Sequence, residues 1–180
     1  MTLALTHNGL PAGLTRWQFF GLIQTARRQL DLSKGAIAYL KVAIGCTQDD
    51  DFKAGRVCAF WTSATKTAGR AEMDRRQVAR IEADLIGRGD LGKSASNHCR
   101  RGGSWENGAI GREFGINLAP LINRVSEIQA AARKAAFEEG ESDHLRARIR
   151  KLFGDIRELQ MDDASEAADG VLPNNRPSTN

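Results

Sequence analysis

The sequence predicts a mainly α-helical protein with a small β-wing, arranged as a winged helix-turn-helix followed by a C-terminal helical hairpin. Three observations lead to this fold class. A short helix, a tight turn and an amphipathic helix follow one another between residues 62 and 89. A glycine-rich basic segment with alternating apolar residues comes next, as in a two-stranded wing. From residue 118 to residue 159, apolar residues recur every three or four positions, which is typical of paired helices.

Length and composition limit the class of protein. The 180 residues have room for one domain with a helical appendage. A formal net charge of +4 and a pI near 9.2 permit nucleic-acid binding. The three cysteines lack metal-type spacing, and the sequence shows neither a signal peptide nor an apolar run of transmembrane length. We therefore expect a cytoplasmic protein without membrane contact.

We expect no metal site and no cofactor. Cys46, Cys58 and Cys99 are widely and irregularly spaced, and no CxxC pair exists, although His98 stands beside Cys99. The three adjacent carboxylates at residues 49–51 lack the alternating ligand spacing of a calcium loop. We therefore interpret the cysteines as buried or incidental thiols, and residues 49–51 as part of a solvated loop.

The N-terminal part of the chain combines an arm and two helices. Residues 1–14 are expected to form a flexible arm. Thr15 and Gln18 form a capping-box pattern, which predicts the start of a helix. Ser33 is the natural N-cap of a second helix, which ends at Gly45.

A predicted strand leads into the helix-turn-helix. Residues 57–61 are apolar and end in an aromatic side chain, which indicates a short strand that pairs with the wing. Thr62 or Ser63 caps the next helix, residues 64–69, which offers only alanines for burial. The turn at residues 69–73 then feeds the second helix of the motif.

The second helix of the motif, residues 73–89, is the predicted recognition helix. Val78, Ile81 and Leu85 recur at i, i+3 and i+7 and share one face. Arg76 and Arg80 fall on the opposite face, one turn apart, where guanidinium groups suit phosphates and guanine edges. An ordinary solvated helix face is the alternative for these two arginines.

The wing that follows carries a local positive charge. Between residues 93 and 112 there are four basic residues and one acid, a net charge of +3. The whole winged-helix domain, with its two N-terminal helices, is predicted to span residues 15–117. Its candidate DNA-binding residues are Ser63, Lys66, Arg75, Arg76, Gln77, Arg80, Lys93, Asn97, Arg100 and Arg101.

One motif points to a different class of function. The sequence GRGDLGKS at residues 87–94 fits the P-loop pattern of nucleotide-binding proteins. A P-loop needs a strand before it and a helix after it, because the helix N-terminus holds the phosphate. Here the pattern predicts a helix before and a hairpin after, so we interpret Gly89 as a helix C-cap and retain nucleotide binding only as an alternative.

The C-terminal third is predicted to be a helical hairpin, residues 118–160, followed by a disordered acidic tail, residues 161–180. Two apolar seams, separated by the polar residues 138–143, support the hairpin. They consist of Leu118, Leu121, Val125, Ile128, Ala132 and Ala135, and of Leu145, Ile149, Leu152, Ile156 and Leu159. Packing of the seams within one chain is preferred over a homodimer, which would use the same faces.

Several segments together resemble a known family. They are WTS at residues 61–63, RRQVARIEADL at residues 75–85, SN at residues 96–97, RR at residues 100–101 and FGINLAPLINR at residues 114–124. This pattern resembles the N-terminal domain of plasmid replication initiation protein C, the RepC initiator of RepABC plasmids, over roughly residues 10–133.

The resemblance implies a non-enzymatic winged-helix domain that binds double-stranded DNA at the plasmid origin. It also implies that the chain takes part in starting replication. A winged-helix transcriptional regulator would use the same surface and is the main alternative. A further alternative is a protein-interaction module that uses only the heptad seams and has no affinity for DNA.

Overall fold

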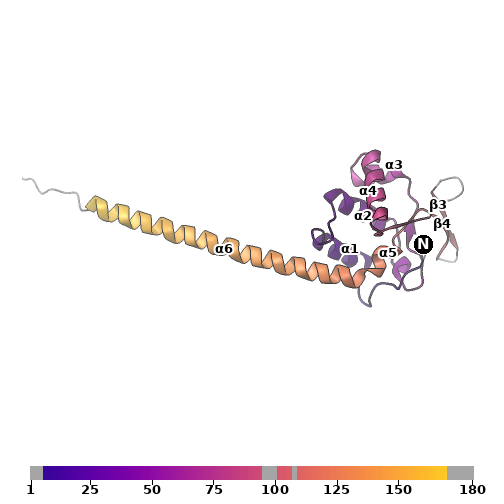
Figure 1. The fold of residues 1–180 in the computed structure, drawn as a ribbon, viewed down its shortest axis with the longest axis horizontal. Helices are drawn as coiled ribbons and strands as arrows, with labels where there is room; N and C mark the ends of the chain where they lie inside the picture. The colour runs from indigo at the N-terminus through magenta and orange to yellow at the C-terminus, as the bar shows by residue number, and fades with distance from the viewer. Residues whose placement is uncertain (1–5, 95–100, 107–108, 170–180) are drawn as a thin grey trace, which may run out of the picture. The chain divides into compact units, whose positions relative to one another are not determined.

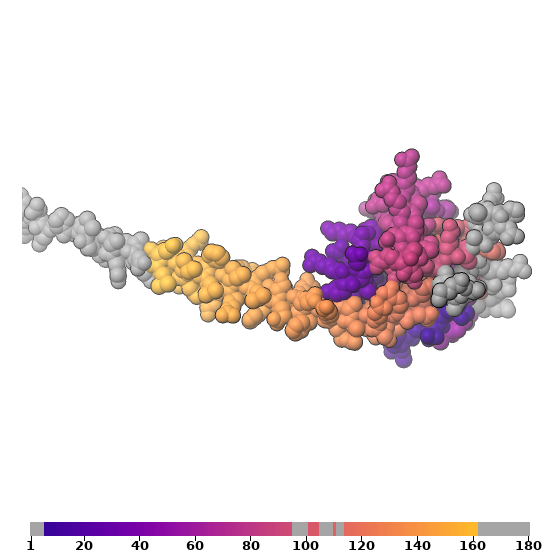
Figure 2. Space-filling model, in the orientation of Figure 1, coloured from indigo at the N-terminus to yellow at the C-terminus, as the bar shows by residue number. Residues whose placement is uncertain are grey.

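A computed structural model describes residues 6–94, 101–106 and 109–169 (Figure 1). The chain divides into two units, Met1–Ala136 and Phe137–Asn180. The residues outside this description are among those drawn in grey in Figure 2. The described residues are mainly helical with a small antiparallel sheet, as the sequence predicts.

Helices make up most of the described chain. They are α1 (Arg16–Thr25), α2 (Lys34–Gly45), the 3-10 helix η1 (Asp49–Phe52), α3 (Ala64–Ala71), α4 (Arg75–Gly87), α5 (Ala119–Asn123) and α6 (Val125–Asp169). The strands are β1 (Ala59–Phe60), β2 (Gly92–Lys93), β3 (Gly102–Glu106), β4 (Ala109–Phe114) and β5 (Ile116–Asn117).

Local side chains set the helix starts. The Thr15–Gln18 capping box is present at α1, and the Ser33 hydroxyl accepts a hydrogen bond from the Ala36 amide at α2. Ser63 caps α3 in the same way. These three caps confirm the predicted starts, because a cap depends only on residues three positions apart.

The strands form a three-stranded sheet and a separate hairpin. The sheet has the order β1–β5–β2 with both pairs antiparallel, and the hairpin pairs β3 with β4. Gly115 joins β4 to β5 where the chain passes very close to β1. A Cβ atom at Gly115 would stand 2.3 Å from the carbonyl oxygen of Phe60, so only glycine fits there.

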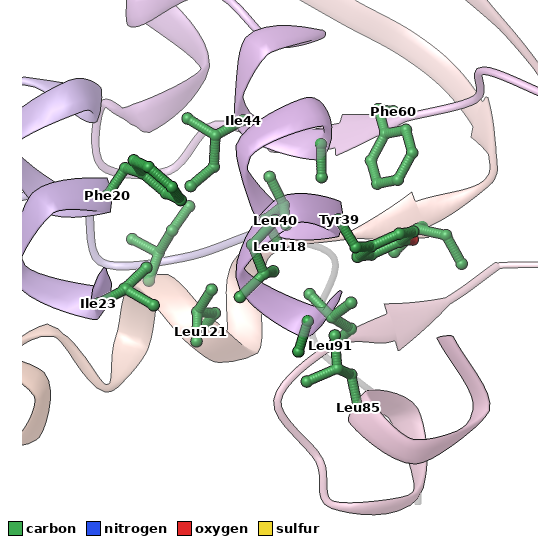
Figure 3. Close-up of a cluster of buried hydrophobic side chains, with 14 of the residues drawn as sticks. Phe20, Ile23, Tyr39, Leu40, Ile44, Phe60, Leu85, Leu91, Leu118 and Leu121 are labelled. Carbon is green, nitrogen blue, oxygen red and sulfur yellow. The ribbon is translucent and has the colours of Figure 1, made fainter. Parts of the chain in front are cut away.

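One apolar core connects the sheet with the helices (Figure 3). Its largest fully buried side chains are Tyr39, Phe19, Phe60, Ile23, Leu40, Ile44, Leu85, Leu91, Ile116, Leu118, Ile122 and Ile128. They come from α1, α2, α4, the sheet, α5 and the first turn of α6, together with Leu91 directly before β2 and Leu118 directly before α5. This core holds α4 in place and leaves its other face to solvent.

The structure corrects the expectation of a flexible arm for the residues it describes, 6–14. Thr6 forms a β-bridge with Val57, and the Leu10 amide donates to the Phe52 carbonyl oxygen over 3.0 Å. His7 is buried, and its backbone oxygen accepts from the Gly55 amide over 2.9 Å. The arm prediction was wrong because these partners lie more than forty residues away in the sequence.

The predicted helical hairpin is also wrong. Residues 125–169 form the single helix α6. Arg124 separates this helix from the preceding short helix α5. The polar residues 138–143 contain one glycine, Gly140, and no proline. A glycine inside a helix costs about 1 kcal/mol, which does not break a helix that is otherwise rich in good helix formers.

The predicted start of the acidic tail at residue 161 is also wrong, because no helix breaker ends α6 there. No proline interrupts the chain between Pro120 and Pro173, and α6 continues to Asp169. Residues 161–169 are therefore helical, and the remainder of the predicted tail, residues 170–180, lies outside the described residues. Among the helices described, α6 included, each is too short or too polar to cross a lipid bilayer.

Candidate nucleic-acid interface

The two faces of α4 separate apolar and basic side chains. Val78 and Leu85 are completely buried and Ile81 is half-buried, whereas Arg76 and Arg80 are exposed. This confirms the predicted division of faces. Asp74 caps the helix by accepting from the amides of Arg76 and Gln77 over 2.6 and 3.0 Å.

Small residues continue the exposed face of α4 beyond its arginines. Arg76, Arg80, Ala83 and Gly87 recur at i, i+4, i+7 and i+11, so they share one side of the helix. Ala83 and Gly87 are exposed and carry no bulky side chain. A flat partner can therefore approach this half of α4 closely.

A left-handed residue sets the turn between α3 and α4. Glu72 has φ +52°, and the Met73 amide donates to the Ala68 carbonyl oxygen over 3.1 Å. α3 packs against α2 and α4, and the buried Ala68 lies in the core. Ser63 and Lys66, at the start of α3, are both exposed. The geometry thus joins two short helices by a three-residue connection.

Five of the candidate cations have no acidic partner among the described residues. They are Lys66, Arg75, Arg76, Arg80 and Lys93, all of them exposed. A shallow depression at the start of α4 is lined by Asp74, Arg75, Arg76 and Ala79. The capping carboxylate of Asp74 already occupies the free amides there, so an anion at this place would be held by the arginines.

Gln77 faces a different direction from the neighbouring arginines. Its Nε2 atom would lie 3.4 Å from a Cβ atom placed on Gly35, near the start of α2. The Ile81 Cδ1 atom would lie 3.1 Å from the same point. Gly35 therefore lets α2 and α4 cross closely, and Gln77 lies toward α2.

Arg101 has partners inside the protein. Its Nη2 atom pairs with a carboxylate oxygen of Glu82 on α4, and its Nη1 atom donates to the Thr62 carbonyl oxygen over 3.0 Å. The other Glu82 oxygen accepts from the Tyr39 hydroxyl over 3.0 Å. Burial, together with the Glu82 carboxylate, raises the pKa of Tyr39 well above its ordinary range, so its hydroxyl remains a donor.

The Arg101 contacts join the start of the β3–β4 hairpin to α4 and to the residue before the α3 cap. Gly103 adds a second attachment, since a Cβ atom there would lie 2.6 Å from Cε3 of Trp61. Glu82 was not among the residues predicted from the sequence. Its position four residues after Val78, on the buried face of α4, is the signal that could have revealed it.

Of the remaining candidate residues, Lys93 is described by the structure, whereas Asn97 and Arg100 are not. Lys93 lies in β2, opposite Ile116 of β5, and its side chain is exposed. Asn97 and Arg100 lie outside the described residues. The described part of the candidate surface is therefore α3, α4, β2 and the base of the hairpin.

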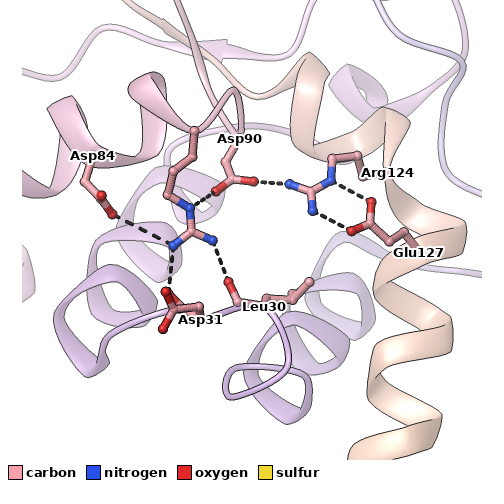
Figure 4. A network of polar contacts seen from close by, with 7 residues as sticks. Leu30, Asp31, Asp84, Asp90, Arg124 and Glu127 are labelled. Carbon is pink, nitrogen blue, oxygen red and sulfur yellow. Dashed lines mark hydrogen bonds and ion pairs between the residues drawn. The ribbon is translucent and has the colours of Figure 1, made fainter.

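A second polar cluster fixes the other end of α4 (Figure 4). Asp90 is buried and pairs with Arg88 Nε over 3.1 Å and with Arg124. Arg88 also donates to the Asp31 carbonyl oxygen over 2.7 Å, which ties α4 to the connection between α1 and α2. This cluster was not predicted, because its members come from three segments that lie far apart in the sequence.

Arg124 completes the cluster at the start of α6. It donates to both carboxylate oxygens of Glu127 over 2.8 and 2.6 Å. These hydrogen bonds lower the pKa of the Glu127 carboxyl and raise the pKa of Arg124. Arg88 and Arg124 are thus occupied by internal partners, unlike the arginines on the outer face of α4.

The GRGDLGKS motif does not have the secondary structure of a P-loop. Helix α4 precedes it, and Gly92–Lys93 is a strand. Gly89 has φ +76°, as expected of a helix C-cap glycine. Cys46 and Cys58 are free thiols, and no cluster of three or more metal-binding side chains occurs within the part of the chain that is described. Cys99 and His98 lie outside that part.

Comparison with known proteins gives the chain a family. Residues 1–162 match the family described as the replication protein C N-terminal domain. A curated relative from Sinorhizobium fredii (strain NBRC 101917 / NGR234), described as "Putative replication protein C", is 24% identical over 161 residues. The aligned region covers 86% of this chain and 39% of the relative. No solved protein structure matches the chain.

Proposed function

The chain belongs to the family of replication protein C N-terminal domains, and we propose that it binds double-stranded DNA at a plasmid origin as part of a replication initiator. The observation that carries this proposal is the outer face of α4. Arg76 and Arg80 stand one turn apart there, both exposed and without an acidic partner among the described residues. Guanidinium groups in such a row bind phosphates or guanine edges.

The proposed mode of binding is that of a winged helix. In this proposal α3 and α4 form the helix-turn-helix, α4 enters the major groove, and the β3–β4 hairpin is the wing. The strand order β1–β5–β2 and the short turn before α4 support it. Ala83 and Gly87 support it as well, because they let the second half of α4 approach the DNA closely.

The candidate residues divide into two roles under this proposal. Arg76 and Arg80 contact the DNA through the exposed face of α4, and Lys66 and Lys93 contact phosphates at its sides. Arg101 acts through structure, because its guanidinium group holds the hairpin to Glu82. Its place between α3, α4 and β3 makes it a positioning residue.

The initiator role rests on the family and extends beyond this chain. The aligned part covers 39% of the curated relative, so other steps of initiation belong to the whole protein. Maintenance of a plasmid whose initiator carries Arg76→Ala and Arg80→Ala separates an initiator from a transcriptional regulator. Loss of the plasmid is expected, and normal copy number for a variant that no longer binds the origin duplex would argue for the regulator.

A binding measurement with a salt series tests the DNA interface directly. Fluorescence anisotropy would follow a labelled origin duplex and an unrelated duplex between about 50 and 200 mM salt. Each lost phosphate contact should reduce the slope of log K against log salt by about 0.9. The Arg76→Ala, Arg80→Ala protein should bind the origin duplex much more weakly than the unaltered chain.

The matched control is the Arg150→Ala, Arg157→Ala protein. Both arginines are exposed on helix α6, and the variant loses the same two charges. It should bind like the unaltered chain. Equal losses in the two variants would show that net charge, and not the face of α4, determines affinity, and would refute the proposed interface.

A further inference from the structure

The second unit carries a continuous apolar seam on α6. Leu145, Ile149, Leu152, Ile156 and Leu159 follow one another at spacings of four, three, four and three residues. Each of the five side chains is more than half exposed. At this spacing they lie along one stripe of the helix, so the stripe is an apolar surface open to solvent.

The order of residue types within the seam is specific. In heptad terms the leucines at 145, 152 and 159 occupy d positions, and the isoleucines at 149 and 156 occupy a positions. In parallel coiled coils, a β-branched residue at a with leucine at d favours two strands. A seam that only covered a core in its own chain would not need this segregation of isoleucine from leucine.

The flanking positions fit the same arrangement. In a parallel pair, each g position faces the e position of the next heptad on the partner. Glu141 then faces Arg146 of the partner subunit, which gives two opposite-charge pairs by symmetry. Arg148 faces the aromatic ring of the partner subunit's Phe153, a cation–π geometry, and the pattern brings no like charges together.

An antiparallel pairing fits less well. In that orientation Glu141 would not face Arg146 of the partner subunit, because g positions face g positions. The Glu141 pair of the parallel form would be replaced by Arg148 with Asp155 of the partner subunit. Each isoleucine would pack against a leucine, so the separate isoleucine and leucine layers of the parallel form would be lost. The segregation of isoleucine from leucine therefore favours the parallel orientation.

We propose that a second copy of this chain covers the seam, and that residues 145–159 of the two copies form a parallel, two-stranded coiled coil. The other apolar seam is not available for this purpose, because Val125, Ile128 and Ala132 are buried in the first unit. With five apolar residues per helix the interface is short, so the association is weak and depends on protein concentration.

Sedimentation equilibrium of the full chain over a wide concentration range tests the association. The unaltered chain should shift from monomer toward dimer as concentration rises. Ile149→Asp places a charge inside the seam and should weaken association by roughly tenfold or more. The control is Phe137→Asp, since Phe137 is exposed on the same helix at a c position, outside the seam.

Circular dichroism should show that both variants retain the helix content of the unaltered chain. The control should associate like the unaltered chain. A chain that stays monomeric at every concentration overturns the proposal. The proposal is also overturned if Phe137→Asp abolishes the association and Ile149→Asp leaves it intact.

A charge exchange tests the orientation. Glu141→Arg and Arg146→Glu should each weaken association by roughly twofold to tenfold, because each creates two like-charge pairs in the parallel dimer. The doubly exchanged protein should recover the original affinity. Without that recovery, Glu141 does not face Arg146 of the partner subunit, and the parallel orientation is refuted even if the chain dimerises.

Discussion

Arg101 and Glu82 form an ion pair that joins the hairpin to α4. Arg101 directly precedes β3, and Glu82 lies on the buried side of α4, where Tyr39 also donates to it. The helix that carries Arg76 and Arg80 and the hairpin beside it are therefore held in one arrangement by a contact across nineteen residues of sequence. Four groups of variants and one pH series probe this arrangement and the rest of the fold.

Arg101→Ala should destabilise the protein. Removing Arg101 leaves the nearly buried carboxylate of Glu82 without a counter-charge, at a cost of about 2–4 kcal/mol, less than for a fully buried pair. Chemical unfolding of Arg101→Ala and Arg80→Ala should show the loss in the first protein only. An Arg101→Ala protein with unchanged stability and weakened DNA binding would instead assign Arg101 a direct phosphate contact.

Arg76→Ala and Ile81→Ala should fail in different ways. Arg76 is exposed, so its removal should change stability by no more than about 0.5 kcal/mol. It should cost roughly 1–3 kcal/mol of preference for the cognate site if the guanidinium group pairs with guanine. Ile81→Ala should lose stability first and binding only as a consequence.

Footprinting at matched salt, with unfolding measured in parallel, separates the two variants. A uniform loss of affinity on all DNA sequences would place Arg76 on a phosphate. Full specific binding by a protein that carries Arg76→Ala and Arg80→Ala would show that α4 is not the recognition helix.

Gly115→Ala should be more damaging than Gly102→Ala. A Cβ atom at Gly115 would meet the backbone oxygen of Phe60 at 2.3 Å, and backbone cannot move aside as a side chain can. No atom lies within 4 Å of the corresponding position on Gly102. We expect a loss of about 1–3 kcal/mol for Gly115→Ala in thermal unfolding. Equal stability of the two variants would contradict the close approach of the strands.

Leu121→Ala and Leu152→Ala test the single helix α6 against a helical hairpin. Leu121 is buried in the core, so Leu121→Ala should lower the free energy of unfolding by on the order of 2–5 kcal/mol. Leu152 is half exposed, so its truncation should cost about 0.5 kcal/mol or less at low protein concentration, where the chain is monomeric. Large losses for both leucines would mean that the seam around Leu152 packs within one chain.

Acidification should destabilise the N-terminal segment through His7. The buried ring uses both nitrogens, because Nε2 lies 2.8 Å from the Asp51 carbonyl oxygen and Nδ1 accepts from the Gly9 amide over 2.9 Å. Burial lowers the pKa of His7 below its usual value. The unfolded chain therefore binds the proton more readily, and stability is lost as the pH falls from about 6.5 toward the lowered pKa.

Urea unfolding at pH 7.5 and at pH 5.5 measures this effect. His7→Gln should reduce the difference between the two pH values, whereas His144→Gln, on exposed α6, should leave it unchanged. An identical pH dependence in the unaltered chain and in His7→Gln would contradict the role given to His7.

Local patterns predicted a large part of the fold. The caps at Thr15, Ser33 and Ser63 and the two faces of α4 were confirmed. Each depends on residues only a few positions apart, so the local sequence is sufficient to indicate it. The Gly89 turn belongs to the same class.

The tertiary structure alone decided what distant residues do. Arg101 reads from the sequence as a phosphate-binding residue, yet it pairs with Glu82, and the buried Asp90 gathers Arg88 and Arg124 from separate segments. The continuity of α6 was likewise undetermined, because a heptad seam has the same spacing whether it packs within a chain or against another. Spacing specifies which residues share a face, but the partner of that face depends on where the remainder of the chain is placed in space.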